Sequence, residues 1–499
     1  MSNKKDFIDL IARGYQSKGE FLTLGSAMLG EETMTGSLVN IPLKTINRHG
    51  LISGATGTGK TKTLQVFAEN LSEKGIPVLL MDLKGDLSGL AKASPGHPKI
   101  DERHAKIGLP FEAKEFPVEI LTISDQDGLR LRATVSEFGP VLLSRILGLS
   151  EVQEGILAIL FQYCDDKQLG LLDLKDLKKV LQYATQEGKD ELESSYGRIS
   201  TASTGSILRK IVALEQQGAD MFFGERSFDV RDLCRLSDDG RGMISVLRLT
   251  DVQDKPQMFS TFMLQLLAEV YNSFPELGDS DRPELVLFID EAHLVFENAS
   301  KSLLDQLESI VKLIRSKGIG IYFVTQNPKD IPSDVLSQLG LKIQHALRAF
   351  TAKDRKAIKL AAENYPDSDF YDTAKVLTEL GIGEALVSAL NEKGVPTPLV
   401  KTMLRAPMSR MDILSKTELE QVIGQSKIAY RYNEIIDSES AYEILNKKIA
   451  SARQEAKETK SKSSSSKKRR STAMNPVLKV VTSATFIRGI FGILKKVMR

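Results

Sequence analysis

The chain has 499 residues, of which 41% are hydrophobic and 26% charged, and both proportions are typical of globular proteins. No stretch approaches the roughly 20 apolar residues that span a bilayer, so the sequence argues against an integral membrane protein. Cys164 and Cys234 are the only cysteines, and their spacing fits neither a metal site nor a disulfide framework, so we expect buried free thiols.

The net charge of +2 is unevenly distributed along the chain. From Lys457 onward there are twelve Lys or Arg residues and one acid, which leaves residues 1–456 at about −9. An acidic body argues against a broad nucleic-acid-binding exterior, although a basic ring lumen is compatible with it. The polar amino terminus lacks the apolar segment of a secretory signal, and we therefore expect a cytoplasmic protein.

The first half of the chain changes pattern near residue 46. Residues 1–45 indicate a helix followed by short strands, with Gly and Thr between them. In residues 46–137, apolar runs of strand length alternate with helical patterns, as in a buried parallel sheet. These runs are Leu51 to Ser53, Val78 to Met81 and Val118 to Ile123. The pattern predicts the first part of an α/β domain.

Residues 138–240 interrupt this alternation because their apolar residues recur at spacings of three and four, which predicts an α-helical insertion. Residues 241–405 return to the α/β pattern. Here the predicted strands are Met243 to Leu249, Leu285 to Ile289 and Ile319 to Thr325. We therefore expect one mainly parallel sheet assembled from two separated parts of the chain.

The carboxyl-terminal part contains three further segments. Residues 406–456 have the pattern of charged helices. Residues 457–472 form a basic, Ser-rich linker that cannot bury a core, and we expect it to be disordered. Residues 473–499 form a short amphipathic segment, suited to a partner, a membrane surface or the body of the protein itself.

A glycine-rich motif follows the first predicted strand of the α/β domain. It satisfies the pattern GxxxxGK[ST] and leads directly into a helical pattern, which is the context of a phosphate-binding P-loop. The glycines allow backbone NH groups to face phosphates, Lys60 reaches the β and γ phosphates, and Thr61 ligates Mg²⁺. We expect ATP and Mg²⁺ to bind at Gly54, Ala55, Thr56, Gly57, Thr58, Gly59, Lys60, Thr61 and Lys62.

Polar side chains also end other predicted strands at the same edge of the sheet. Asp290 and Glu291 follow the strand that begins at Leu285; Asp290 suits the Mg²⁺ shell, and Glu291 suits activation of the attacking water. Gln326, after the next strand, is a third catalytic candidate because its amide can sense the γ phosphate or hold the water. Asp82 either supports Mg²⁺ or Lys60, or only marks a strand-to-loop transition.

Several longer strings, GATGTGKT, FIDEAH, VTQNP, LLMDLKGDLSG and KIQHALRAFT, resemble the HerA and FtsK superfamily of ring-forming P-loop ATPases, most closely the bacterial HerA-like proteins of the YjgR type. The resemblance covers roughly residues 20–405. It implies a RecA-like core, a hexameric ring with ATP sites between subunits, and an arginine finger from a neighbour. Of the candidates Arg198, Arg209, Arg226, Arg315 and Arg348, we favour Arg209 in trans and Arg348 in cis.

Three functions are compatible with these observations. The resemblance favours an ATPase that moves or unwinds DNA, although the sequence contains no base-reading motif. An ATPase that remodels or exports protein is the first alternative, with a protein partner held by the helical insertion or the carboxyl-terminal helix. The second alternative is a nucleotide-gated scaffold with slow turnover. The intact Glu291 argues against an inactive enzyme.

Overall fold

The computed structural model describes residues 2–278, 280–296, 301–349, 351–434, 436 and 438–462. Most of the predicted basic linker, and the whole of the predicted amphipathic segment 473–499, lie outside these residues. The linker prediction can be compared with the structure only at its start. There, helix α17 (Ala441–Lys462) continues six residues beyond 456, where we expected the helical part of the chain to end.

In the described part of the chain, twelve strands form a single sheet. The strands are β1 (Phe21–Leu29), β2 (Glu32–Pro42), β3 (Gly50–Ser53), β4 (Val78–Asp82), β5 (Val118–Thr122), β6 (Leu129–Arg130), β7 (Ile244–Arg248), β8 (Leu285–Ile289), β9 (Ile319–Thr325), β10 (Leu341–Gln344), β11 (Glu384–Ser388) and β12 (Val400–Leu404). Their spatial order is β2-β1-β12-β11-β10-β3-β9-β8-β4-β7-β5-β6.

In this spatial order, each strand from β10 through β3, β9, β8, β4, β7 and β5 to β6 pairs in parallel with its neighbour. Every strand that we predicted from an apolar run is among them. These strands are almost entirely buried because helices cover both faces of the sheet, which is why their sequences are continuously apolar. The predicted mixed α/β fold with a mainly parallel sheet is confirmed.

The other edge of the sheet is antiparallel. β1 pairs with β2 on one side and with β12 on the other, where Gly25 lies opposite Leu404. Only glycine fits at position 25, because a Cβ atom there would lie 1.9 Å from the carbonyl oxygen of Met403. The amino-terminal strands, which the sequence indicated as short strands after a helix, are therefore part of the main sheet.

Side chains along the central strands alternate between two apolar cores, as the strand period requires. Leu51 and Leu79 belong to one core, and Ile52 and Leu80 belong to the other. The first core includes residues of α9 (Pro256–Ser273) and α11 (Lys301–Ile314), and the second includes residues of α1 (Ser2–Gly14), α2 (Lys60–Glu73) and α15 (Lys416–Gly424). The sheet is thus a central layer between helices.

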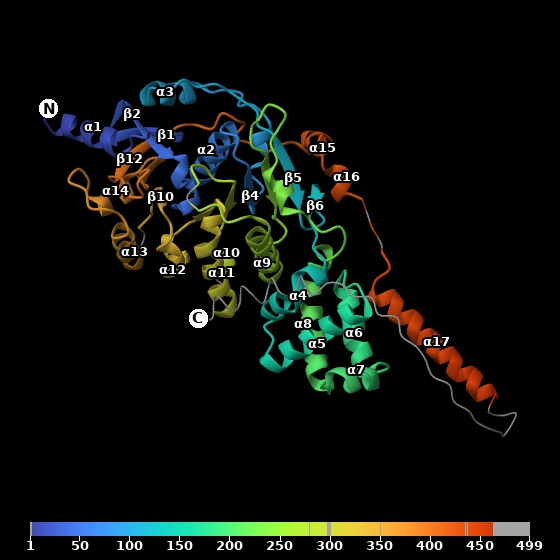
Figure 1. The fold of residues 1–499 in the computed structure, drawn as a ribbon. Coiled ribbons are helices and arrows are strands. Elements are labelled where there is room, and N and C mark those ends of the chain that lie inside the picture. Colours follow the sequence, from blue (N-terminus) through green and yellow to red (C-terminus); the bar gives the residue numbers. More distant parts are fainter. Residues whose placement is uncertain are drawn as a thin grey trace.

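The predicted insertion is helical. It contains α4 (Val135–Ile146), α5 (Glu151–Lys167), α6 (Leu174–Thr185), α7 (Lys189–Tyr196) and α8 (Thr201–Gln216). Figure 1 shows these helices gathered beside one another below β5 and β6. A capping box at Thr134, with Glu137 as its reciprocal partner, begins α4. The apolar residues of these helices join the first core, so the insertion is packed against the sheet layer.

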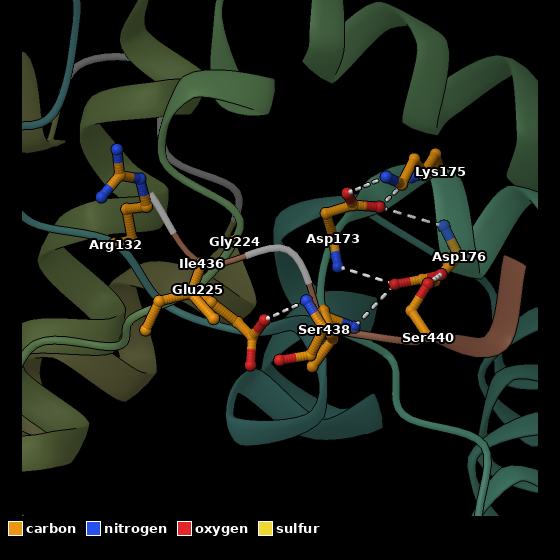
Figure 2. A pocket seen from close by; sticks show the side chains of 10 residues that line it. Arg132, Asp173, Lys175, Asp176, Gly224, Glu225, Ile436, Ser438 and Ser440 are labelled. Carbon is orange, nitrogen blue, oxygen red and sulfur yellow. Dashed lines mark hydrogen bonds and ion pairs between the residues drawn. The ribbon is translucent and has the colours of Figure 1, made fainter. Parts of the chain in front are cut away.

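The carboxyl-terminal helices return to this insertion. The first half of α17 packs on α6, and its Lys448 forms a 2.9 Å ion pair with Glu191. Just before α17, the Ser440 hydroxyl donates a 2.5 Å hydrogen bond to the buried carboxylate of Asp176, and the Ser438 NH donates to Glu225 (Figure 2). These contacts border a cavity of about 180 Å³. We call α4 to α8 together with α17 the helical lobe.

The remaining α-helices are short. They are α3 (Pro98–Ile107), α10 (His293–Phe296), α12 (Ser333–Leu336), α13 (Ala352–Ala362), α14 (Thr373–Glu379) and α16 (Ala429–Tyr432). Among the described residues, no helix has the length and apolar character needed to cross a membrane. Both cysteines are free, Cys164 buried and Cys234 half-buried, and burial raises the pKa of the Cys234 thiol to about 12.

Candidate nucleotide-binding site

The glycine-rich motif forms a tight loop between β3 and α2. Gly54, Gly57 and Gly59 all have positive φ angles, of 147°, 77° and 111°. Gly54 also packs so closely on His345 that a Cβ atom would lie 2.5 Å from the His345 Cβ. The backbone of the loop is tied to neighbouring strand ends, because Ala55 NH donates to the carbonyl of Ala346 at 2.8 Å. The local sequence therefore builds the P-loop that the motif predicts.

Lys60 begins α2, and its side chain folds back over this loop. Its ammonium donates to the carbonyl oxygens of Gly54 at 2.7 Å and Ala55 at 3.1 Å. Lys60 is only 6% exposed, and burial lowers the pKa of its ammonium. Since α2 begins at Lys60, its first NH groups and its helix dipole face the same space as the loop. This is an anion-binding arrangement.

The two residues after Lys60 differ in what they offer a ligand. Thr61 is half-buried at the start of α2, where its hydroxyl is suited to a metal ion. The Lys62 ammonium instead donates to the carbonyl oxygen of Met411 at 2.5 Å. The Lys62 side chain is thus committed to the protein, and its backbone NH is the group suited to a phosphate.

Asp290 and Glu291 follow β8 and lie almost buried, with exposures of 3% and 8%. Asp290 Oδ2 and Glu291 Oε2 are buried without a hydrogen-bond partner, a costly condition for carboxylate oxygens. Burial is the main cause that raises the pKa of Asp290 to about 6. Glu291 also has a φ of 44°, a strained conformation for a residue other than glycine. Such features concentrate where a ligand completes a site.

Lys84 is a site residue that our sequence reasoning missed. Its ammonium lies 2.5 Å from Glu291 Oε1 and 3.6 Å from Asp290 Oδ2. Burial alone would lower the pKa of Lys84, but the two carboxylates raise it overall. Lys84 stands in the string LLMDLKGDLSG, which contained the signal, because a lysine two residues past a strand end lies at the same sheet edge as the acids.

Asp82, in the same string, has a different role from the metal role considered above. Its carboxylate accepts hydrogen bonds from the backbone NH groups of Gly85, Asp86 and Leu87, at distances of 2.7 to 3.2 Å. Asp82 thereby shapes the loop that carries Lys84. The geometry supports the strand-to-loop reading of this residue.

A cavity of about 720 Å³ lies next to the P-loop. Its lining includes Ala55 and Thr56 of the P-loop, together with His293, Gln326 and Arg348. Gln326 follows β9 and Arg348 follows β10, and both side chains are exposed. The structure therefore places Gln326 and Arg348 on the same cavity as the P-loop.

Arg209 lies elsewhere. It is exposed on α8 of the helical lobe and does not line this cavity. A position outside the cavity of its own chain is compatible with our expectation that Arg209 acts on a neighbouring subunit, which a single chain does not test. Its role stays a prediction.

His345 is a second residue that we did not anticipate. It is fully buried behind the P-loop, and its Nε2 lies 2.9 Å from the hydroxyl of Thr63 on α2. Burial is the main cause that lowers the pKa of His345 to about 4, and the nearby Lys60 lowers it further. The neutral ring therefore supports the loop and α2 without adding charge. Its sequence signal was its place in the string KIQHALRAFT.

The chemistry of the site fits Mg²⁺ bound together with a nucleotide. The described residues contain no group of three or more His, Cys, Asp or Glu side chains that could hold a metal ion alone. Mg²⁺ commonly takes one or two protein oxygens and completes its shell with water and phosphate oxygens. Asp290, whose buried Oδ2 has no hydrogen-bond partner, and the hydroxyl of Thr61 are groups of this kind.

Three similar proteins illustrate what this chain is related to. The DNA double-strand break repair helicase HerA of Sulfolobus acidocaldarius is 22% identical over 371 residues, which are 73% of this chain and 66% of that protein. The DNA import protein CedB of the same organism is 25% identical over 359 residues, covering 72% of this chain and 52% of that protein. This chain thus spans less than two thirds of the length of these relatives.

The plasmid coupling protein TrwB, solved in complex with ADP and Mg²⁺, superimposes with a TM-score of 0.52 over 81% of this chain and 94% of that chain. At 16% identity this likeness concerns the fold alone. The family of helicase HerA-like C-terminal domains matches residues 28–490. Because this match covers most of the sequence, the chain belongs to the helicase HerA-like C-terminal family.

Proposed function

We propose that the chain binds ATP with Mg²⁺ at the P-loop and hydrolyses it. One observation carries the proposal: two buried carboxylates, each with an oxygen that accepts no hydrogen bond, lie at the same sheet edge as a P-loop lysine. Asp290 and Glu291 follow β8, Lys60 begins the helix after β3, and β9 separates these two strands. A phosphate-binding loop beside buried acids is the arrangement that phosphoryl transfer to water requires.

Each residue has a role that follows from its position. Lys60 leaves the carbonyl oxygens that it now contacts and binds the β and γ phosphates. Thr61 and Asp290 would hold Mg²⁺, which would neutralise the developing charge on the phosphates. Glu291 accepts a hydrogen bond from the attacking water, whose oxygen bonds to the γ phosphorus as the bond from phosphorus to the bridging oxygen breaks. ADP leaves with that electron pair, and the proton of the water passes through Glu291 to the released phosphate. Gln326 positions the water or senses the γ phosphate.

We further propose that the hydrolysis drives movement along DNA, or its unwinding, in a hexameric ring. The support is family membership and two relatives whose names specify DNA work, a repair helicase and a DNA import protein. Arg348 lines the nucleotide cavity and would act within its own chain. Arg209 would reach the site of a neighbouring chain. A cytoplasmic location, expected from the polar amino terminus, belongs to the same proposal.

The test is steady-state ATP hydrolysis by the purified chain, with and without single-stranded and double-stranded DNA at low salt. Glu291→Gln serves as the background control. DNA-stimulated hydrolysis supports the motor. Hydrolysis that is indifferent to DNA would limit the proposal to the ATPase and favour a protein substrate. A nucleotide-dependent change in oligomer size without turnover would favour the scaffold and contradict the motor.

A further inference from the structure

Lys84 and Glu291 each lie just after a strand, and these two strands are neighbours in the sheet. β4 and β8 pair in parallel, with Met81 opposite Ile289. The loops that follow these strands therefore leave the sheet side by side, and both carry charged side chains over its carboxyl edge. The short ion pair between Lys84 and Glu291 is a consequence of this sheet pairing.

The loop that carries Lys84 is held in place by several contacts. The Asp82 carboxylate accepts three backbone NH groups of the loop, and the carbonyl oxygen of Leu83 accepts a hydrogen bond from the Gln253 side chain. Gly85 has a φ of 77°, and a Cβ atom there would lie 2.9 Å from Thr250. The Lys84 side chain, 35% exposed, thus extends from a fixed point.

The two carboxylates need a cation when no nucleotide is present. Asp290 and Glu291 are consecutive, nearly buried acids, and adjacent buried negative charges are strongly unfavourable without a counter-charge. Lys84 supplies a charge to both of them. The remaining oxygen of Glu291 lies 3.3 Å from His293 Nδ1, a weaker contact that depends on protonation of the ring. Lys84 is therefore the main compensating charge.

We propose that Lys84 is the resident counter-ion of this acid pair and restrains Glu291 in the nucleotide-free chain. While its Oε1 is paired with the ammonium, the Glu291 carboxylate is neutralised and poorly able to polarise a water molecule. When the charge of the metal ion enters with the nucleotide, the ammonium is no longer required at the acids, and Glu291 is released for its role in hydrolysis. Lys84 is a positioning residue, and the inference rests on the proposed function.

The first test uses a metal ion alone. Mn²⁺, a spectroscopic substitute for Mg²⁺, is titrated into the nucleotide-free full chain and followed by electron paramagnetic resonance. Lys84→Met removes the charge and keeps a similar length, so Mn²⁺ should bind about tenfold more tightly or better. Lys99→Met, at an exposed lysine of α3, is the matched control and should bind like the unaltered chain. Equal Mn²⁺ affinity in Lys84→Met and the unaltered chain would overturn the proposal.

The second test measures ATP hydrolysis without DNA. Lys84→Met should reach its half-maximal rate at a lower Mg²⁺ concentration and show a basal rate several-fold above that of the unaltered chain. A rate that falls more than about tenfold in Lys84→Met would overturn the restraint and make Lys84 a catalytic residue. Lys84→Arg keeps the charge and should resemble the unaltered chain in both tests.

Two further controls separate the possible failures. If Lys84→Met does not fold, as judged by circular dichroism and thermal unfolding, Lys84→Gln replaces it, because the amide retains a hydrogen bond to Glu291 without charge. If the unaltered chain does not hydrolyse ATP under any condition, the proposed function fails. The Mn²⁺ titration needs no nucleotide, so it still decides whether Lys84 competes with a cation.

Discussion

The carboxyl edge of the sheet, where the P-loop, Lys84, Asp290 and Glu291 lie, differs from the helical lobe in how its buried polar groups find hydrogen-bond partners. At the edge, Asp290 and Glu291 each keep a buried oxygen without a hydrogen-bond partner. In the described part of the lobe, the Ser144 hydroxyl is the only such group, while Asp176 accepts bonds from Ser440 and three backbone NH groups. The ammonium of Lys178, on α6, forms a 2.6 Å ion pair with the carboxylate of Glu215, on α8.

This difference indicates which region is complete by itself. Apart from Ser144, the described part of the lobe buries its polar side chains together with hydrogen-bond partners, as a structural unit does. The edge leaves carboxylates short of partners and folds Lys60 onto its own backbone, which is expected where a ligand supplies the missing contacts. Substitutions at the edge should therefore change nucleotide chemistry, and those in the lobe should change stability or the action of one chain on another.

The largest effect is expected for Lys60→Ala. Removing this ammonium should weaken ATP binding about 100-fold, since hydrogen bonds to charged groups contribute about 1.5–3 kcal/mol each, and hydrolysis should fall to background. Isothermal titration calorimetry with ATP and Mg²⁺ measures the change. Lys74→Ala at the other end of α2, where the lysine forms a surface ion pair with Glu20, is the control. Equal losses in both variants would show that α2 had unfolded.

Glu291→Gln should separate binding from turnover. The amide keeps the shape of the side chain but cannot act as a base, so kcat should fall about 1000-fold while ATP binding is retained. Single-turnover hydrolysis measures the rate. Glu284→Gln, at an exposed acid just before β8, should hydrolyse normally. A Glu291→Gln chain with unaltered kcat would remove this residue from the mechanism.

Arg209→Ala is the one substitution in the lobe that should affect hydrolysis, by about 100-fold, because we expect this arginine to stabilise charge in a neighbour's site. Mixing Arg209→Ala with Lys60→Ala should restore part of the activity, since a chain with intact Arg209 then serves a chain with an intact P-loop. Arg348→Ala, which alters the cavity of its own chain, should gain nothing from the same mixture. Absence of restoration for Arg209 would contradict its assignment.

Asp176→Ala should affect stability and leave ATP affinity unchanged. The buried Asp176 carboxylate joins α6 to the start of α17, and its removal leaves several backbone NH groups without a hydrogen-bond acceptor. We expect a loss of about 3 kcal/mol in the free energy of unfolding, measured by urea denaturation. If ATP affinity fell in parallel, the two regions would be coupled more tightly than their separate polar contacts suggest.

The smallest expected effect concerns pH. Burial is the main cause that lowers the pKa values of His49 and His345 to about 4, from about 6.5 in the unfolded chain. The two rings are harder to protonate in the folded chain than in the unfolded chain. The stability that they contribute as neutral rings is therefore complete above pH 6.5 and is lost as the pH falls toward 4. At pH 5 each ring should cost about 2 kcal/mol.

Urea unfolding at pH 7 and pH 5 measures this loss. His49→Asn keeps a short polar side chain where φ is 58° and should lose less stability on acidification than the unaltered chain. Buried acids such as Glu69, whose pKa is raised to about 7 chiefly by burial, act in the opposite direction. The comparison is therefore between the two chains, and equal pH dependence would exclude His49 as a contributor.

The sequence alone determined the local parts of the structure. Strand positions follow from apolar runs, because strands buried on both faces need apolar residues throughout. The P-loop is a contiguous segment whose glycines, Lys60 and Thr61 are specified by adjacent residues, so its conformation could be predicted from the motif. The acids after β8 were visible for the same reason, since a strand end places them at a known edge.

Only the tertiary structure decided which strand ends lie together. Lys84 meets Glu291 because β4 is next to β8, and β1 joins the sheet because it pairs with β12, nearly 380 residues away. Likewise, α17 packs on α6, although the two helices lie in distant parts of the sequence. Strand order and helix docking depend on contacts distant in sequence, whereas strand identity and the P-loop motif depend on adjacent residues. For this reason the catalytic candidates could be predicted, while the partner of Glu291 could not.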